Sequence, residues 1–70
     1  MKYIELNAFV KLKNLAQTGG RAKLLIRSGT LLVNGVVETR NRRKLVTGDK
    51  VSVDGQEFIV EEGMLREHGD

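Results

Sequence analysis

Two dipeptides, Asn34-Gly35 and Asp54-Gly55, constrain the fold of this chain more than any other feature of its sequence. Asn, Asp and Gly tolerate the positive φ that a type I′ turn requires, and such a pair between short apolar runs is a strong signal for a β-hairpin. The sequence therefore predicts two hairpins, which join Leu31–Val33 to Val36–Val37 and Lys50–Val53 to Gln56–Val60. In the second hairpin Val51, Val53, Phe58 and Val60 alternate at period two, so we expect them to share one buried face.

The first half of the chain has helical periodicity. Tyr3–Leu6 is predicted as a short strand, and Asn7 as the N-cap of a helix over Ala8–Ala16. The apolar residues of this helix fall on one face, apart from Val10, which falls outside it. That face consists of Ala8, Phe9, Leu12, Leu15 and Ala16.

A second helix is predicted over Gly20–Ser28, with Ala22, Leu25 and Ile26 on its apolar face and Gly29 ending it. The expected fold class is α+β: a two-helix pair packed on a small, mostly antiparallel sheet.

The chain has 70 residues and no cysteine, which allows one small domain without disulfides or thiolate-bound zinc. We expect this single domain to cover residues 1–63. Residues 64–70 lack a core pattern and are predicted to form a disordered tail. Met1–Glu5 has no signal-peptide pattern, and no apolar run approaches the roughly 20 residues needed to span a bilayer. We therefore expect a cytoplasmic protein that does not contact membranes.

Residues 21–44 hold most of the positive charge. They contain seven basic residues against one acid, Glu38, for a net charge of +6 in a chain whose total is +3. Residues 1–20 carry +2, and residues 45–70 carry −5. This asymmetry indicates a polyanionic partner. The alternative is that the basic and acidic parts pair with each other within the fold.

Few side chains offer catalytic chemistry. The single histidine, His68, falls in the predicted tail, so neither Ser28 nor Ser52 has a histidine base within the expected domain. Asp49 and Asp54 fall in predicted turns, where aspartate is favoured for local hydrogen bonding. We predict that the protein is not an enzyme and that it uses no cofactor and no metal.

The basic residues of the second helix oppose its local stability. Lys23 and Arg27 are four residues apart and repel each other, and Arg21 lies in the first turn, where the helix dipole disfavours a cation. Residues that break local rules without local gain are expected at functional sites. The alternative is a solvated face whose long side chains cover apolar surface.

Four short segments together resemble the S4 RNA-binding domain family. They are Gly20-Arg21-Ala22, Leu25–Gly29, Val33-Asn34-Gly35, and Gly48-Asp49 before Val51, within a resemblance over roughly residues 6–60. The resemblance implies two helices with a small sheet, and binding of structured RNA, often ribosomal or transfer RNA. It is greatest to the small stand-alone bacterial form, which has no catalytic domain.

The sequence departs from the family pattern at three places. Gly20 stands where the family commonly has Ser or Thr, Thr47 stands where it commonly has Pro, and Ile4–Asn7 offers no Arg near the first helix. The last departure argues against an RNA contact from the extreme N-terminus.

We therefore predict a non-catalytic, monomeric module that grips structured RNA, ribosomal or transfer RNA, by phosphate contacts, for which arginine is well suited. Aromatic residues are scarce, so recognition of backbone and shape is expected rather than base stacking. Alternatives are a protein-interaction or homodimerisation module and a duplex DNA binder. Replacing Arg42 and Arg43 is expected to lower RNA affinity without affecting stability. The predicted contact residues are Arg21, Lys23, Arg27, Arg40, Arg42, Arg43 and Lys44, with Lys11 and Lys13 secondary.

Overall fold

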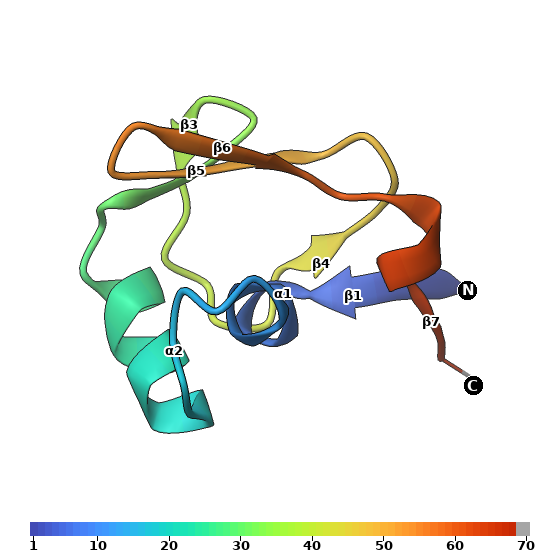
Figure 1. Ribbon diagram of the computed structural model, residues 1–70, viewed down its shortest axis with the longest axis horizontal. Helices are drawn as coiled ribbons and strands as arrows, with labels where there is room; N and C mark the ends of the chain where they lie inside the picture. Colours follow the sequence, from blue (N-terminus) through green and yellow to red (C-terminus); the bar gives the residue numbers. More distant parts are fainter. Residues whose placement is uncertain (69–70) are drawn as a thin grey trace.

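The computed structural model describes residues 1–68 (Figure 1). The elements follow one another as β1 (Lys2–Glu5), α1 (Leu6–Leu12), α2 (Gly19–Arg27), β2 (Leu31–Val33), β3 (Val36–Val37), β4 (Lys44–Leu45), β5 (Lys50–Val53), β6 (Gln56–Ile59), the 3-10 turn η1 (Glu62–Met64) and β7 (Arg66–Glu67).

The strands form two antiparallel sheets, where the sequence predicted one. The larger sheet has the order β3-β2-β5-β6, and the smaller has the order β4-β1-β7. The predicted α+β class is confirmed. The second sheet forms because β1 pairs with two distant two-residue strands and not with either hairpin. Figure 1 shows the larger sheet lying above α1 and β1.

Both predicted hairpins are present. β2 pairs with β3 across Asn34-Gly35, and β5 pairs with β6 across Asp54-Gly55. The four turn residues all have positive φ, between 50° and 81°, as type I′ turns require. Val51, Val53 and Val60 are buried and Phe58 packs against them, so the predicted shared face is confirmed.

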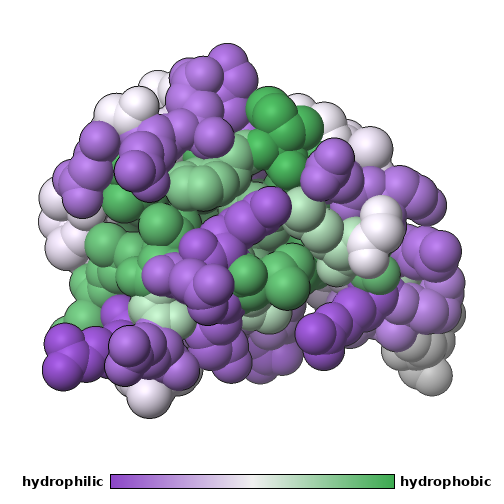
Figure 2. All heavy atoms as spheres, in the orientation of Figure 1, coloured by the Kyte–Doolittle hydropathy of each residue, from purple (hydrophilic) through white to green (hydrophobic). Residues whose placement is uncertain are grey.

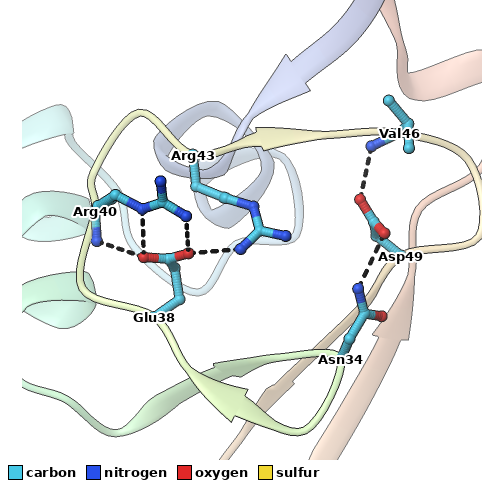
Figure 3. A network of polar contacts seen from close by, with 6 residues as sticks. All are labelled: Asn34, Glu38, Arg40, Arg43, Val46 and Asp49. Carbon is cyan, nitrogen blue, oxygen red and sulfur yellow. Dashed lines mark hydrogen bonds and ion pairs between the residues drawn. The ribbon is translucent and has the colours of Figure 1, made fainter.

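A side-chain network fastens the tip of the first hairpin to the turn before β5 (Figure 3). Asp49 accepts hydrogen bonds from Asn34 Nδ2 at 3.1 Å and from the Val46 amide at 2.8 Å. Asn34 Oδ1 in turn accepts from the Lys50 amide at 3.0 Å. These two residues therefore lock together two turns that are far apart in the sequence.

Helix α1 is shorter and starts earlier than predicted. It begins at Leu6, because backbone carbonyls of Asn41 and Arg43 accept hydrogen bonds from the Asn7 and Leu6 amides and take the place of the expected Asn7 cap. It ends at Leu12, because Asn14 adopts φ of +58°. The Leu15 amide then bonds to the Val10 carbonyl, which completes a Schellman-type ending with Asn in the position usually held by Gly.

Helix α2 begins one residue earlier than predicted. The Thr18 hydroxyl accepts a hydrogen bond from the Arg21 amide and caps the helix, so Gly19 and Gly20 form its first turn. Gly29 follows the helix with φ of +82°, in the predicted terminating position.

The core draws on both helices and both sheets. From α1 it takes Leu6, Phe9 and Val10, so the expectation that Val10 points away from the core is wrong, and Leu12 is 49% exposed instead. The rest of the predicted face is confirmed, because Phe9 is buried and Ala8, Leu15 and Ala16 pack against the core. Figure 2 shows the molecule in the orientation of Figure 1. Hydrophobic atoms lie at the surface in the middle of this view, within a discontinuous rim of polar side chains. The large apolar side chains exposed among residues 1–68 lie outside the core cluster, whose members are at most 6% exposed.

The segment after residue 63 is ordered as far as it is described, which corrects the predicted disordered tail for residues 64–68. Met64 and Leu65 pack against the core, and β7 pairs with β1. A two-residue strand is too short to show alternation, so no sequence pattern indicated this pairing. Residues 69–70 of the predicted tail lie outside the described residues. Within residues 1–68, no helix has the length and apolar character to cross a bilayer.

Candidate nucleic-acid interface

Residues 39–43, here called the arginine loop, connect β3 to β4 and carry Arg40, Arg42 and Arg43. Two of the loop's backbone carbonyls accept hydrogen bonds from the first two amides of α1, at 2.8 and 3.0 Å. The next residue, Lys44, is paired with Glu5 of β1. The loop is therefore held at both the helix and the small sheet, and its arginines project from a fixed backbone.

Glu38 holds two of these arginines (Figure 3). Its carboxylate, with only 9% of the side chain exposed, accepts from Arg40 Nε and Nη2, both at 3.1 Å, and from Arg43 Nη1 at 2.7 Å. It also accepts from the Arg40 backbone amide at 3.0 Å. A buried carboxylate with four bonds of this kind fixes both guanidinium groups relative to the loop.

The charge state of Glu38 follows from these contacts. The Arg40 side chain, helped by the Arg40 amide and Arg43, lowers the pKa of Glu38 from 4.5 to about 2, against burial, which raises it. The same contact raises the pKa of Arg40. Glu38 is therefore ionised at neutral pH.

Arg42 is held by a second acid from a different element. Its Nε donates to Glu5 at the end of β1, at 3.0 Å, while 79% of the Arg42 side chain stays exposed. Four basic side chains then line one hollow of about 420 Å³: Arg40, Arg42, Arg43 and Lys44. The structure thus brings together the four predicted residues at positions 40–44.

The predicted cations of the helices are placed differently. Arg21, Lys23 and Arg27 are exposed on α2, which packs against α1. Lys11 and Lys13 lie at the C-terminal end of α1, opposite the arginine loop and about 10 Å from it along the helix. None of these five has a salt bridge within the described part of the chain.

The internal ion pairs match the alternative of paired basic and acidic parts only at the N-terminus, where the amino group of Met1 binds Glu67 and Lys2 binds Glu62. Among residues 1–68, no salt bridge joins the basic segment 21–44 to the acidic segment 45–70. The paired arginines use Glu38 and Glu5, which come from the basic parts of the chain. The large charge asymmetry is therefore present on the folded molecule.

Sequence reasoning missed the two carboxylates that orient the arginines. Glu38 carried a signal, since it is the one acid among the seven cations of residues 21–44 and lies two residues before Arg40. Glu5 carried none, because its partner Arg42 lies 37 positions away in the chain. The sequence also predicted that replacing Arg43 would leave the stability unchanged. The hydrogen bond from Arg43 to the buried Glu38 argues against this prediction.

Aromatic side chains are mostly unavailable for base stacking. Phe9 is fully buried and Phe58 is packed against the core. Tyr3 is half-buried, with the His68 ring stacked on it at 3.6 Å between centroids and Lys44 Nζ at 5.1 Å from its ring centroid.

Comparison with known proteins identifies the family of this chain. The model of the S4 domain family matches residues 1–61, and the chain belongs to this family. A protein of Escherichia coli (strain K12) named "Putative RNA-binding protein YbcJ" is 42% identical over 58 residues, which are 83% of each chain.

A second relative is the "Probable ribosome maturation protein RlbA" of Bacillus subtilis (strain 168). It is 40% identical over 52 residues, 74% of this chain and 73% of that protein. The solution structure of E. coli YbcJ, whose description names a motif involved in RNA binding, superposes with a TM-score of 0.64 at 39% identity. The superposition covers 84% of this chain and 75% of YbcJ.

Proposed function

We propose that this chain is a non-catalytic, monomeric, cytoplasmic module that binds structured RNA by its phosphates, through a surface centred on the arginine loop. The observation that carries the proposal is the hollow lined by Arg40, Arg42, Arg43 and Lys44. A guanidinium has more N–H donors than the bonds to Glu38 and Glu5 use, so each arginine keeps donors for a phosphate. The carboxylates fix these donors in advance, which lowers the ordering cost of binding.

The cations of α2 would continue this surface. Lys23 and Arg27 repel each other and are exposed, which is unfavourable for the free helix and favourable once a polyanion lies against them. Arg21 is placed in the first turn of the same helix. Lys11 and Lys13, at the other end of α1, would make secondary contacts.

The relatives support structured RNA as the ligand class. One is named as an RNA-binding protein and another as a ribosome maturation protein, which favours ribosomal RNA, with transfer RNA as the other candidate. The scarcity of available aromatic rings supports recognition of backbone and shape over recognition of unpaired bases.

Salt-dependent binding of a labelled RNA hairpin tests the proposal. About five phosphate contacts predict a slope near −4 for log K against log salt, because each contributes about −0.7 to −0.9. A slope near zero would overturn the phosphate mechanism. A DNA hairpin of the same sequence should compete poorly; equal competition would indicate a duplex DNA binder. Light scattering at low and high salt should give a monomer, and a dimer would support the interaction module.

A further inference from the structure

A second, smaller hollow adjoins the arginine loop on the side of β1. Its volume is about 290 Å³, and it is lined by Ile4, Glu5, Ala8, Arg42, Arg66 and His68. Arg42 lines this hollow and the larger one, so the two are adjacent. Arg66 and His68 come from the C-terminal segment, outside the basic segment that the proposed function uses.

Strand β7 is held against β1 by several independent contacts. Arg66 pairs with Tyr3 in the antiparallel register, and the His68 amide donates to the Met1 carbonyl at 3.0 Å. The His68 ring lies nearly parallel to the Tyr3 ring, with an interplanar angle of 9°. Since β1 is the middle strand of its sheet, Lys44 of β4 and Arg66 of β7 lie on its two sides.

Arg66 has no acidic partner of its own among residues 1–68. Its neighbour in the sequence, Glu67, and the acid that lines the same hollow, Glu5, both have other partners. Glu67 binds the amino group of Met1 at 2.7 Å, and Glu5 binds Arg42. The hollow therefore contains one paired and one unpaired guanidinium, which is the charge arrangement suited to a bound phosphate.

We propose that β7 forms a second arm of the RNA-binding surface, in which Arg66, beside Arg42, binds a phosphate of the RNA that the arginine loop holds. The Tyr3–His68 stack keeps the end of β7, and with it Arg66, against β1. This inference rests on the proposed function, and it extends the surface from the helices across the small sheet to the C-terminal segment.

The test compares Arg66→Ala with Lys50→Ala in the full chain, using the same labelled RNA hairpin. Both changes remove one cation, but Lys50 lies in the larger sheet, paired with Glu57. Arg66→Ala should weaken binding about 3- to 10-fold and reduce the salt slope by about 0.7–0.9, whereas Lys50→Ala should change neither. Arg66→Lys should keep the slope, which separates charge from any loss of folding.

A measurement on the unmodified protein makes the test independent of folding. Backbone amide signals of residues 66–68 should shift on addition of the RNA hairpin, together with those of residues 40–44. One outcome would overturn the proposal for β7 and leave the proposed function intact. In that outcome Arg42→Ala weakens binding, Arg66→Ala does not, and the amide signals of residues 66–68 do not shift. If neither variant weakens binding, the proposed function itself fails.

Discussion

Glu38 is the residue on which the arrangement of the arginine loop depends. Among residues 1–68, its carboxylate accepts every side-chain hydrogen bond that Arg40 and Arg43 donate, and it does so from a buried position. Removing this buried charge weakens four hydrogen bonds to a carboxylate at once, and the cost exceeds that of breaking one surface pair.

We expect Glu38→Gln to lower the free energy of unfolding at pH 7 by about 2–3 kcal/mol, the scale set by a pKa depressed from 4.5 to about 2. Because the folded pKa is depressed, this stabilisation is fully present above pH 4.5 and is lost as the pH falls towards 2. Urea unfolding at pH 7 and pH 3 should therefore show a smaller difference between parent and variant at pH 3. Glu57→Gln, at an exposed position, is the control; equal effects of the two changes at pH 7 would contradict the role of Glu38.

The two neighbouring arginines should separate stability from binding. Arg43 is 31% exposed and bonds to Glu38, whereas Arg42 is 79% exposed and bonds to Glu5. We expect Arg43→Ala to destabilise the fold by about 1–2 kcal/mol and Arg42→Ala by less than about 0.5 kcal/mol. Both should lower RNA affinity. Urea unfolding and RNA titration on each variant check this, and equal stability of the two variants would show that the Arg43–Glu38 bond contributes nothing.

The composition of the basic segment showed which residues carry positive charge, but not which groups bind them in the fold. The sequence predicted Arg40, Arg42 and Arg43 as one cluster, and the structure gathers them round one hollow. Which carboxylates bind these arginines depends on the path of the arginine loop back to α1 and β1. This path is set by contacts between distant residues, which the periodicity of the sequence does not reveal.

At the scale of elements, the hairpin turns could be predicted from adjacent residues, whereas features that depend on contacts between distant residues could not. The hairpins formed as predicted because Asn34-Gly35 and Asp54-Gly55 encode their own turn geometry. The start of α1 was mispredicted because its first amides are satisfied by residues more than 30 positions away. The strands β4 and β7 were missed because two residues cannot show a pattern.

Two segments that carry the family resemblance have a structural role here. Asn34 and Asp49 hydrogen-bond each other and hold the first hairpin to the turn before β5. We expect a double-mutant cycle of Asn34→Ala and Asp49→Ala to give a coupling energy of about 1 kcal/mol in urea unfolding. RNA affinity per folded molecule should stay unchanged. Additive effects of the two changes would mean that this hydrogen bond does not link the turns, and a loss of affinity would place the turns in the interface.

At the scale of the whole molecule, the C-terminal segment closes the small sheet. A chain that ends at Leu65 loses the pairing of β7 with β1 and the stack of His68 on Tyr3. We expect its free energy of unfolding to fall by about 1–2 kcal/mol, with unfolding still cooperative, because the core cluster is retained. A chain that ends at His68 is the matched control and should unfold like the parent. Identical unfolding of the shorter chain and this control would show that β7 adds no stability.

The first strand of the chain is the middle strand of its sheet, and this has a consequence for biosynthesis. β1 leaves the ribosome before its partners, residues 44–45 and 66–67, and the first amides of α1 are satisfied only when residues 41–43 are available. Pairings over such sequence distances form late. A nascent chain thus emerges beside a large mass of RNA with its arginines still on an unfolded backbone, and it gains a fixed array of donors only after these later segments have also emerged.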